Sequence, residues 1–400
     1  MSSLHLPLLD WLNLLVRWAH IVAGIMWIGN SFLFVWLDSA LHGTTRAREG
    51  DVVGEIWLVH SGGFYEVVKR RSLRPEELGP PLYIFKWQSY MTWITGVLLL
   101  GIVYWAAGSV MLVDTSVATL TPAQAVALSV TVLLGGWILY DLIWTAPFAE
   151  DARLGNLLSV LLLVAAAYGL THVFSARAAF IHFGALIGTC MAGNVFRHIV
   201  PGQSRMLADT RAGRPVDTTP GARAKARSMH NHYLTLPVLF TMISNHFAMT
   251  YGHAQAWIVL LLLTTVGMCI KYVMNHRLGG NRAVLPIGVA ALLALLWMTA
   301  QVPASSAAGA AGARTVPFAE AEAIVQRRCV ACHAEHPTNA SFTAPPNGVR
   351  LDAPERIVAL APRIMERAVV TRTMPLGNIT GMTDAERATL GAWIAQGARR

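Results

Sequence analysis

Two cysteines and a histidine near the end of the chain have a spacing that serves redox chemistry. Cys329 and Cys332 are separated by two residues, and His333 follows directly. Two thiols one helical turn apart can add to the two vinyl groups of a haem, while the next imidazole reaches the iron. A zinc site would need a second cysteine pair, and no βαβ pattern surrounds the motif as in a thioredoxin-like protein. The motif therefore predicts one covalent c-type haem, with His333 as an iron ligand.

A methionine thioether is the usual second iron ligand where the reduction potential is high, and three methionines follow the motif. Met365 lies in a helical pattern, where methionine is mostly a core residue, and Met382 directly precedes a helix N-cap. Met374 is followed by Pro375, which ends any helix and favours an extended loop. We therefore predict that Met374 is the second iron ligand, opposite His333.

Elements of two kinds must position these residues. The motif lies between two amphipathic stretches, Phe318–Arg328 and Asp384–Ala395, in a pattern typical of a small class I cytochrome c. The rest of the chain is far more apolar, because 54% of the 400 residues are hydrophobic and only 13% are charged. Soluble domains have about 25% charged residues. This composition excludes a disordered chain, and four cysteines are too few for a disulfide scaffold. It predicts a membrane protein.

Eight mostly apolar windows are long enough to cross a bilayer, which takes about 20 residues. They are Trp11–Leu37, Tyr90–Val113, Ala123–Thr145, Leu154–Phe174, Ala178–Ile199, Tyr233–Tyr251, Ala256–Met274 and Val284–Val302. We therefore predict an all-α fold in three parts. A polytopic membrane helix bundle of about eight transmembrane helices covers residues 1–302, a small-residue linker covers 303–314, and a small class I cytochrome c domain covers 315–400.

The distribution of basic residues predicts the orientation of the bundle. The net charge of +9 arises from 31 Lys and Arg against 22 Asp and Glu. Most basic residues of the apolar part fall in residues 38–89 and 200–232, and basic loops of membrane proteins are cytoplasmic. Because cytoplasmic loops account for this positive charge, we predict no nucleic-acid partner. It places the N-terminus and residues 315–400 on the periplasmic side of a bacterial inner membrane, the side where c-type haem is attached.

Ionisable residues inside a membrane span are costly and usually functional. Arg17 and His20 lie on one face of the first span, His182 lies in the fifth, and Asn245 and His246 lie in the sixth. We predict that these five residues are catalytic. Two other interpretations remain open: the three histidines could ligate an additional b-type haem, or they could join helices through hydrogen bonds.

A second group of polar and aromatic residues lies on the predicted cytoplasmic side. Its members are His60, Tyr65, Lys69, Trp87, His230 and Asn231. Aromatic and cationic side chains suit a flat anion, so this group is a candidate substrate-side cluster. The alternative is an interfacial belt, since Trp, Tyr and Lys gather where a membrane meets water.

Several of these segments resemble one family. They are Arg17-Trp18-Ala19-His20, Trp27-Ile28-Gly29-Asn30-Ser31-Phe32, the run from His60 to Tyr65, Lys86-Trp87, the run from His230 to Pro237, and Ser244-Asn245-His246. The chain thereby resembles the bacterial membrane-bound urate hydroxylases, which are integral-membrane, cytochrome c-linked urate oxidases. The resemblance extends over the whole chain. One departure is Phe247, where the family pattern has Tyr.

The resemblance implies that urate is oxidised, by hydroxylation, to 5-hydroxyisourate. Electrons would pass through the fused c-type haem to a downstream cytochrome or terminal oxidase of the respiratory chain, without release of hydrogen peroxide. The main alternative is a non-catalytic, membrane-anchored electron carrier or respiratory-complex subunit; a transporter with a haem sensor is a third. The electron-carrier alternative leaves the interior Arg17 and His20 unexplained, and an anchor needs one helix rather than eight.

Overall fold

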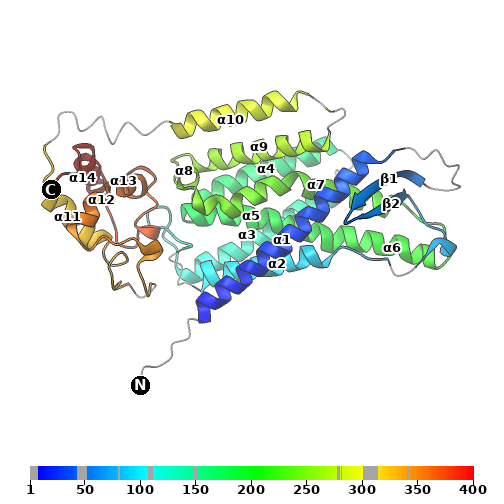
Figure 1. Ribbon diagram of the computed structural model, residues 1–400, viewed down its shortest axis with the longest axis horizontal. Helices are drawn as coiled ribbons and strands as arrows, with labels where there is room; N and C mark the ends of the chain where they lie inside the picture. Colours follow the sequence, from blue (N-terminus) through cyan, green and yellow to red (C-terminus); the bar gives the residue numbers. More distant parts are fainter. Residues whose placement is uncertain are drawn as a thin grey trace, which may run out of the picture.

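A computed structural model describes residues 8–42, 52–79, 82–106, 111–146, 152–276, 280, 282–300, 314–339 and 342–400. The chain forms a bundle of long helices with a smaller helical domain at one end (Figure 1). The bundle consists of α1 (Leu8–Ala40), α2 (Trp87–Leu100) with its π-helical continuation η2 (Gly101–Trp105), α3 (Pro122–Thr145), α4 (Ala152–Thr171), α5 (Ala176–Asn194), η4 (Val195–Ile199), α6 (Val200–Arg211), α7 (Thr219–Ile243), η5 (Ser244–His246), α8 (Ala248–Tyr251), α9 (Ala256–Asn275) and α10 (Val284–Ala300).

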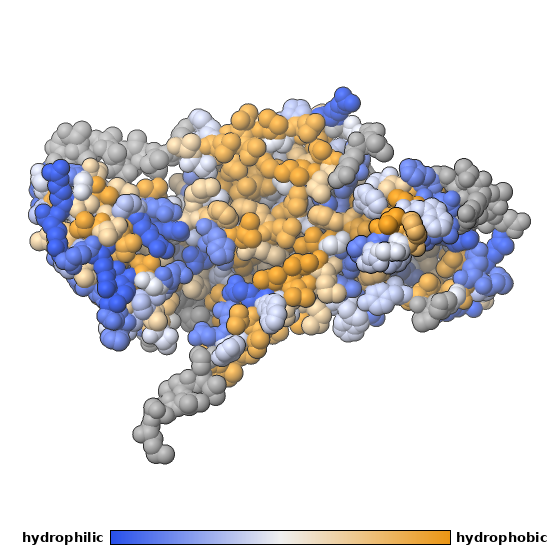
Figure 2. Space-filling model, viewed as in Figure 1, coloured by the Kyte–Doolittle hydropathy of each residue, from blue (hydrophilic) through white to orange (hydrophobic). Residues whose placement is uncertain are grey.

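Within the described residues, five helical segments are long and apolar enough to cross a membrane. They are α1, α3, α4, the continuous helix Ala176–Arg211 and α9. The helix α10 is apolar but shorter, and each of the eight predicted windows contains a helix. Figure 2 shows the corresponding apolar band across the middle of the bundle, with polar surfaces at both ends. These features are consistent with membrane association.

The window Tyr233–Tyr251 is not one continuous helix, and this corrects the sequence-based prediction. The helix α7 ends at Ile243, and Phe247 has a non-helical backbone (φ −120°, ψ 74°) before the short helix α8. The Ser244 hydroxyl donates to the Thr241 carbonyl. Hydrogen bonds of this kind let Ser compete with the helical backbone pattern.

The prediction of an all-α fold is also wrong in one loop. Residues Val52–His60 and Gly63–Arg70 form an antiparallel hairpin, β1 and β2. Ser61 and Gly62 make the turn, with φ of 51° and 76°. A two-residue turn with both φ positive matches the right-handed twist of the strands, and glycine adopts it without strain. The β-branched and aromatic residues on both sides of Ser61-Gly62 are the sequence signal for this hairpin. Gly62 provides the positive φ that the turn requires.

The helix α5 is the centre of the bundle, with 13 of its 19 residues buried. It packs closely on its neighbours at glycines. A Cβ added to Gly184 would overlap the Thr241 hydroxyl on α7, and one added to Gly193 would overlap the Trp137 indole on α3. Small residues let helices approach closely in a bilayer, where packing supplies much of the association energy.

This packing makes Gly184 sensitive to substitution. We expect Gly184→Leu to lower the thermal unfolding midpoint of the detergent-solubilised protein, since overpacking a well-filled contact costs about 1–3 kcal/mol. The matched control is Gly188→Leu on the same helix, because no atom lies within 4 Å of a Cβ added there. Equal unfolding midpoints for the two variants would contradict the close α5–α7 contact.

The C-terminal domain consists of short helices around its own core. These are α11 (Phe318–Arg328), η8 (Pro346–Gly348), α12 (Pro354–Ala359), α13 (Ala361–Ile364), η9 (Met365–Val370), η10 (Leu376–Asn378) and α14 (Asp384–Ala395). The rings of Phe318 and Trp393 lie 5.8 Å apart where α11 meets α14. The two amphipathic helices predicted from the sequence are confirmed with the same bounds. Apart from Arg314, the predicted linker 303–314 lies outside the described residues.

The C-terminal domain packs against one end of the bundle. The Thr115 amide donates to the Gly377 carbonyl at 3.3 Å. The Arg367 guanidinium donates to the Tyr251 hydroxyl at 3.5 Å. We call this end of the bundle the motif end. The opposite end, near β1 and β2 in Figure 1, is the hairpin end.

Candidate functional site

The Cys329–His333 motif forms a tight turn directly after α11. The amides of Cys332 and His333 both donate to the Cys329 carbonyl, at 3.2 and 2.9 Å. The His333 ring lies 3.0 Å through Nδ1 from the Val349 carbonyl. A carbonyl can only accept, so Nδ1 carries the proton and Nε2 keeps its lone pair. A backbone partner of this kind is the usual way to orient a metal-ligating imidazole.

The electrostatics of the motif suit a haem ligand set. Burial raises the pKa of the Cys329 thiol to about 12, and burial also lowers the pKa of His333. His333 is therefore neutral near pH 7, which is the form that binds metal. Two free thiols and one neutral imidazole in a turn fit covalent attachment of a c-type haem.

The three candidate methionines occupy different surroundings. Met382 is 3% exposed and belongs to the core of the C-terminal domain, whereas Met374 is half-buried in a loop outside that core. Met365 is half-buried at the start of η9. These surroundings set Met382 apart from the other two, and the coordination of iron by Met374 stays a prediction.

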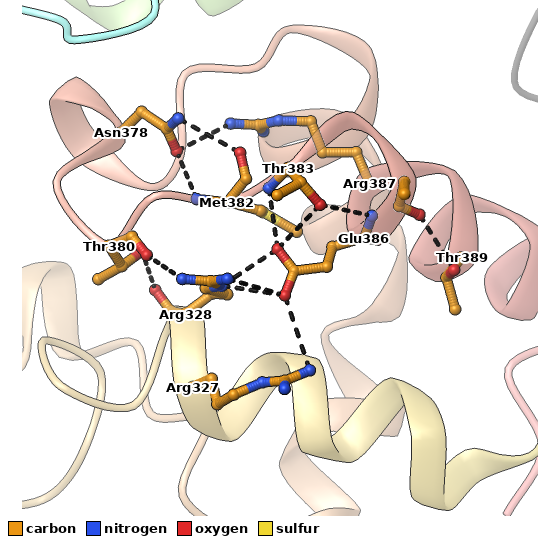
Figure 3. A network of polar contacts seen from close by, with 10 residues as sticks. Arg327, Arg328, Asn378, Thr380, Met382, Thr383, Glu386, Arg387 and Thr389 are labelled. Carbon is orange, nitrogen blue, oxygen red and sulfur yellow. Dashed lines mark hydrogen bonds and ion pairs between the residues drawn. The ribbon is translucent and has the colours of Figure 1, made fainter.

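The loop that carries Met374 is fixed from α14. The buried Arg387 guanidinium donates to the carbonyls of Ala368 and Met374, the latter at 2.7 Å, and to the Asn378 side chain at 3.4 Å. Figure 3 shows Arg387 lying beside Asn378. In the same network, Glu386 accepts from Arg328, the residue before Cys329, at 3.1 Å (Figure 3). The motif and the methionine loop are therefore held by one helix.

Removing the thiols should separate covalent attachment from simple haem binding. We expect Cys329→Ser and Cys332→Ser each to change the spectrum of the pyridine–haem complex, because one thioether is lost. The double variant should lose all covalent haem on a denaturing gel stained for haem. Cys269→Ser, on α9, is the control and should keep it. Covalent haem in the double variant would exclude this motif as the attachment site.

The predicted catalytic residues do not form one cluster. Among the described residues, no three His, Cys, Asp or Glu side chains lie together in a way that could hold a metal ion. The His182 ring is completely buried, with Nε2 2.7 Å from the Ser129 hydroxyl and Nδ1 2.8 Å from the Ala178 carbonyl. Both nitrogens are thus occupied, so these contacts fit a histidine that joins α3 to α5 and do not fit an iron ligand.

The other predicted catalytic residues lie on α1 and in η5. His20 contacts α2 through Nδ1, 3.0 Å from both the Thr92 carbonyl and the Thr95 hydroxyl. The Arg17 side chain is exposed and donates to Asn13 at 2.9 Å. His246 is exposed. These contacts leave the catalytic role of each residue a prediction.

Asn245 stands out among these residues. Its Oδ1 atom is buried without a hydrogen-bond partner, and its side chain lies close to the buried Tyr104. The buried Tyr104 ring in turn lies edge-on to His182, with ring centroids 5.7 Å apart. Asn245 and His182 therefore reach one neighbourhood through Tyr104.

The predicted substrate-side cluster is divided between two locations. His60, Tyr65 and Trp87 are exposed at the hairpin end, and Lys69 pairs with Asp38. His230 and Asn231 lie inside the bundle on α7. They are accompanied there by Tyr140, whose hydroxyl is 2.8 Å from His230, and by Asn194, whose amide is 2.8 Å from Asn231.

A buried ionic cluster lies next to His230 and was missed in the sequence. Asp141 on α3 accepts ion pairs from Arg197 at 2.9 Å, His198 at 2.5 Å and Arg227 at 3.7 Å. Arg227 is 5% exposed and also lies over the Tyr140 ring, 5.3 Å from its centroid. One carboxylate thus faces the buried Arg227 and the exposed Arg197.

The hairpin end also contains a cavity of about 310 Å³ between α1, α7 and α9. It is lined by Phe32, Leu33, Val35, Trp36, Ser39, His232, Lys271, Met274 and Asn275. A second cavity of about 220 Å³ shares Val35, Ser39 and Asn275 with the first. The second cavity is also lined by Asp38, the partner of Lys69. The two cavities therefore lie next to each other at this end of the bundle.

Lys271 and Asp141 could have been identified from the sequence. Lys271 is the only charged residue between Ala256 and Met274, and Asp141 is the only one between Ala123 and Thr145. A single charge in a membrane span is by itself a candidate functional residue. The predicted catalytic residues lie in other spans, so Lys271 and Asp141 are absent from the sequence-based prediction.

Comparison with known proteins assigns the bundle. A family model described as "Urate oxidase N-terminal" matches residues 7–301. No curated protein and no solved structure matches the chain. The matched range contains every helix from α1 to α10, with the cavity and the ionic cluster, and ends before the C-terminal domain. The chain therefore belongs to the urate oxidase N-terminal family.

Proposed function

We propose that this protein oxidises urate to 5-hydroxyisourate in its helical bundle and passes the electrons to a c-type haem on its own C-terminal domain. The observation that carries the proposal is the contact between the two parts. A domain with the Cys329–His333 motif packs, through Arg367 and Tyr251, on a bundle that belongs to a urate oxidase family. A urate-oxidising bundle and a haem domain in one chain favour electron exit through the protein itself.

The reaction balances without hydrogen peroxide. Urate and one water give 5-hydroxyisourate, two protons and two electrons. A haem iron, when bound, accepts one electron at a time, so each urate requires two successive transfers. The electrons then leave to a downstream cytochrome or terminal oxidase of the respiratory chain. The water supplies the oxygen that is added to the purine.

The residues of the C-terminal domain have defined tasks in this proposal. Cys329 and Cys332 would hold the haem covalently. His333 would bind the iron through Nε2, because Nδ1 donates to the Val349 carbonyl. Met374 would supply the second iron ligand, and Arg387 holds the loop that carries it. An additional b-type haem finds less support, because both nitrogens of His182 are occupied. We therefore derive no step through such a haem.

The membrane arrangement follows from the same division. Five helices have the length and apolarity to cross a bilayer, and α10 is a shorter apolar helix. We propose a multi-pass protein of the bacterial inner membrane with about eight transmembrane helices. The hairpin end, which carries the basic residues 38–89 and 200–232, would be cytoplasmic. The motif end and the C-terminal domain would be periplasmic.

An anaerobic visible spectrum tests the proposed function. The purified, air-oxidised protein is measured before and after addition of urate, and chemical reductant is added last. We expect urate to reduce the c-type haem and the solution to contain 5-hydroxyisourate without hydrogen peroxide. A spectrum that changes only with chemical reductant would overturn the proposal and favour a non-catalytic electron carrier.

A further inference from the structure

We infer that the cavity around Lys271 binds the planar anionic substrate, and that Lys271 compensates its negative charge. This inference rests on the proposed function, because it assigns a site to the urate that the bundle is proposed to oxidise. It uses a side chain that sequence reasoning missed and a cavity at the hairpin end, away from the haem motif.

The first argument is the state of Lys271. The residue is 2% exposed, and no carboxylate among the described residues lies within ion-pair distance of its ammonium group. Its Nζ atom lies over the Phe32 ring, 3.1 Å from the centroid. A cation–π contact offsets only part of the cost of burying a charge, since buried charges are normally paired. Lys271 is therefore a buried cation that lacks an anion.

The second argument is the polar group beside Lys271. His232 bonds to the Asn275 side-chain oxygen through Nε2 at 2.8 Å and to the Ser31 hydroxyl through Nδ1 at 3.2 Å. The Asn275 oxygen can only accept, so Nε2 of His232 donates, and Nδ1 accepts from Ser31. This pairing uses the oxygen of Asn275 and leaves its Nδ2 donor buried without a partner. Among the described residues, Lys271 thus offers the cavity an unpaired cation and Asn275 an unpaired donor.

The third argument is shape. The cavity is about 310 Å³, at the small end of the range for ligand sites. The aromatic rings of Phe32 and Trp36 line it together with Lys271, and the face of an aromatic ring suits a flat conjugated ligand. Urate is a flat purine anion that offers carbonyl oxygens to Asn275 and negative charge to Lys271. Within the described residues, the ionic cluster of Asp141 is less suitable, because its carboxylate already opposes the cations there.

The test compares Lys271→Met with Lys271→Arg and with Lys86→Met. Methionine keeps most of the length of lysine and removes its charge, whereas arginine keeps the charge. Lys86 does not line either cavity, and its ammonium group lies over the Trp87 ring, 5.9 Å from the centroid. Binding of labelled urate is measured by equilibrium dialysis on the full-length protein after chemical reduction, because a reduced haem cannot accept electrons and urate is not consumed. KM and kcat are then measured with the oxidised protein.

We expect Lys271→Met to weaken urate binding and to raise KM by tenfold or more, with a smaller change in kcat. Lys271→Arg should recover part of the affinity, and Lys86→Met should behave as wild type. The same Lys271→Met variant should unfold at a higher temperature than wild type, because it removes an unpaired buried charge. Lower affinity with higher stability cannot result from misfolding.

Two failures are distinguishable. If the wild-type protein neither binds urate nor is reduced by it, the proposed function fails. If the wild type oxidises urate and Lys271→Met has the same affinity and KM, the inference about this cavity is wrong and the proposed function stands. Should Lys271→Met not fold, Asn275→Ala gives the second measurement, and unchanged urate affinity in that variant would equally overturn the inference.

Discussion

Asp141→Asn should be among the most destabilising single substitutions in the bundle. The change keeps the size of the side chain and removes the charge that faces Arg197, His198 and Arg227. Arg227 would then be a buried cation without a carboxylate, and one of its nitrogens already lacks a partner. Removing one member of a buried ion pair typically costs about 3–5 kcal/mol. We expect a correspondingly lower unfolding midpoint in detergent, followed by tryptophan fluorescence.

The control is another aspartate with an exposed partner. Asp209, on α6, forms an ion pair of 2.6 Å with Arg214. The Arg214 side chain is 61% exposed. Exposed ion pairs contribute about 0–1 kcal/mol, so Asp209→Asn should be close to wild type. A double variant, Asp141→Leu with Arg227→Leu, should recover much of the stability lost in Asp141→Asn. If Asp141→Asn unfolds like the control, the cluster does not depend on its carboxylate.

Arg387→Met should release the loop that carries Met374. Methionine fills the space of the arginine stem but cannot donate to the carbonyls of Ala368 and Met374. Each buried acceptor left unpaired costs about 1–3 kcal/mol. We expect a less stable C-terminal domain and a lower haem reduction potential, because a loosened loop weakens a thioether ligand to iron. The potential is measured by redox titration of the visible spectrum.

Thr389→Ala on the same helix is the matched control. The Thr389 hydroxyl donates one solvent-exposed hydrogen bond to the Ala385 carbonyl, at 3.0 Å. Its loss should change stability by less than about 0.5 kcal/mol. The potential distinguishes positioning from general stability. If Arg387→Met lowers stability and leaves the potential unchanged, Arg387 does not position an iron ligand, and Met374 loses its support for that role.

The sequence allowed most helices to be located, but it did not allow the contacts between them to be predicted. Apolar windows and the Thr383–Glu386 capping box are local signals, so α3, α9, α10 and α14 were predicted close to their observed bounds. In contrast, α7 begins at Thr219, well before the predicted window. The neighbours of Lys271 come from other helices, with Phe32 on α1 and His232 on α7. Nothing in one sequence states which helix faces oppose one another.

The prediction for the hairpin failed for a different reason. Its signal was local and complete, since strand-forming residues flank a two-residue turn at Ser61 and Gly62. The sequence-based prediction assigned His60 and Tyr65 to a substrate-side cluster because of their side-chain chemistry. It did not use the strand-forming residues of the same segment. In the structure both residues are exposed on the strands.

The separation between the Lys271 cavity and the haem motif has an electrical consequence. Lys271 lies fifteen residues beyond Ala256, the start of α9 near the motif end, which is about 22 Å along a helix. If urate is oxidised in this cavity, its two electrons must cross most of the bilayer thickness to reach the Cys329–His333 motif, while its protons are left behind. Direct transfer over this distance is too slow, so a carrier between the two sites is then required. Moving one electron across the whole membrane changes its free energy by about 2.3 kcal/mol per 100 mV of membrane potential. With the proposed orientation the electrons move towards the positive side, so a charged membrane would speed turnover and turnover would discharge the membrane.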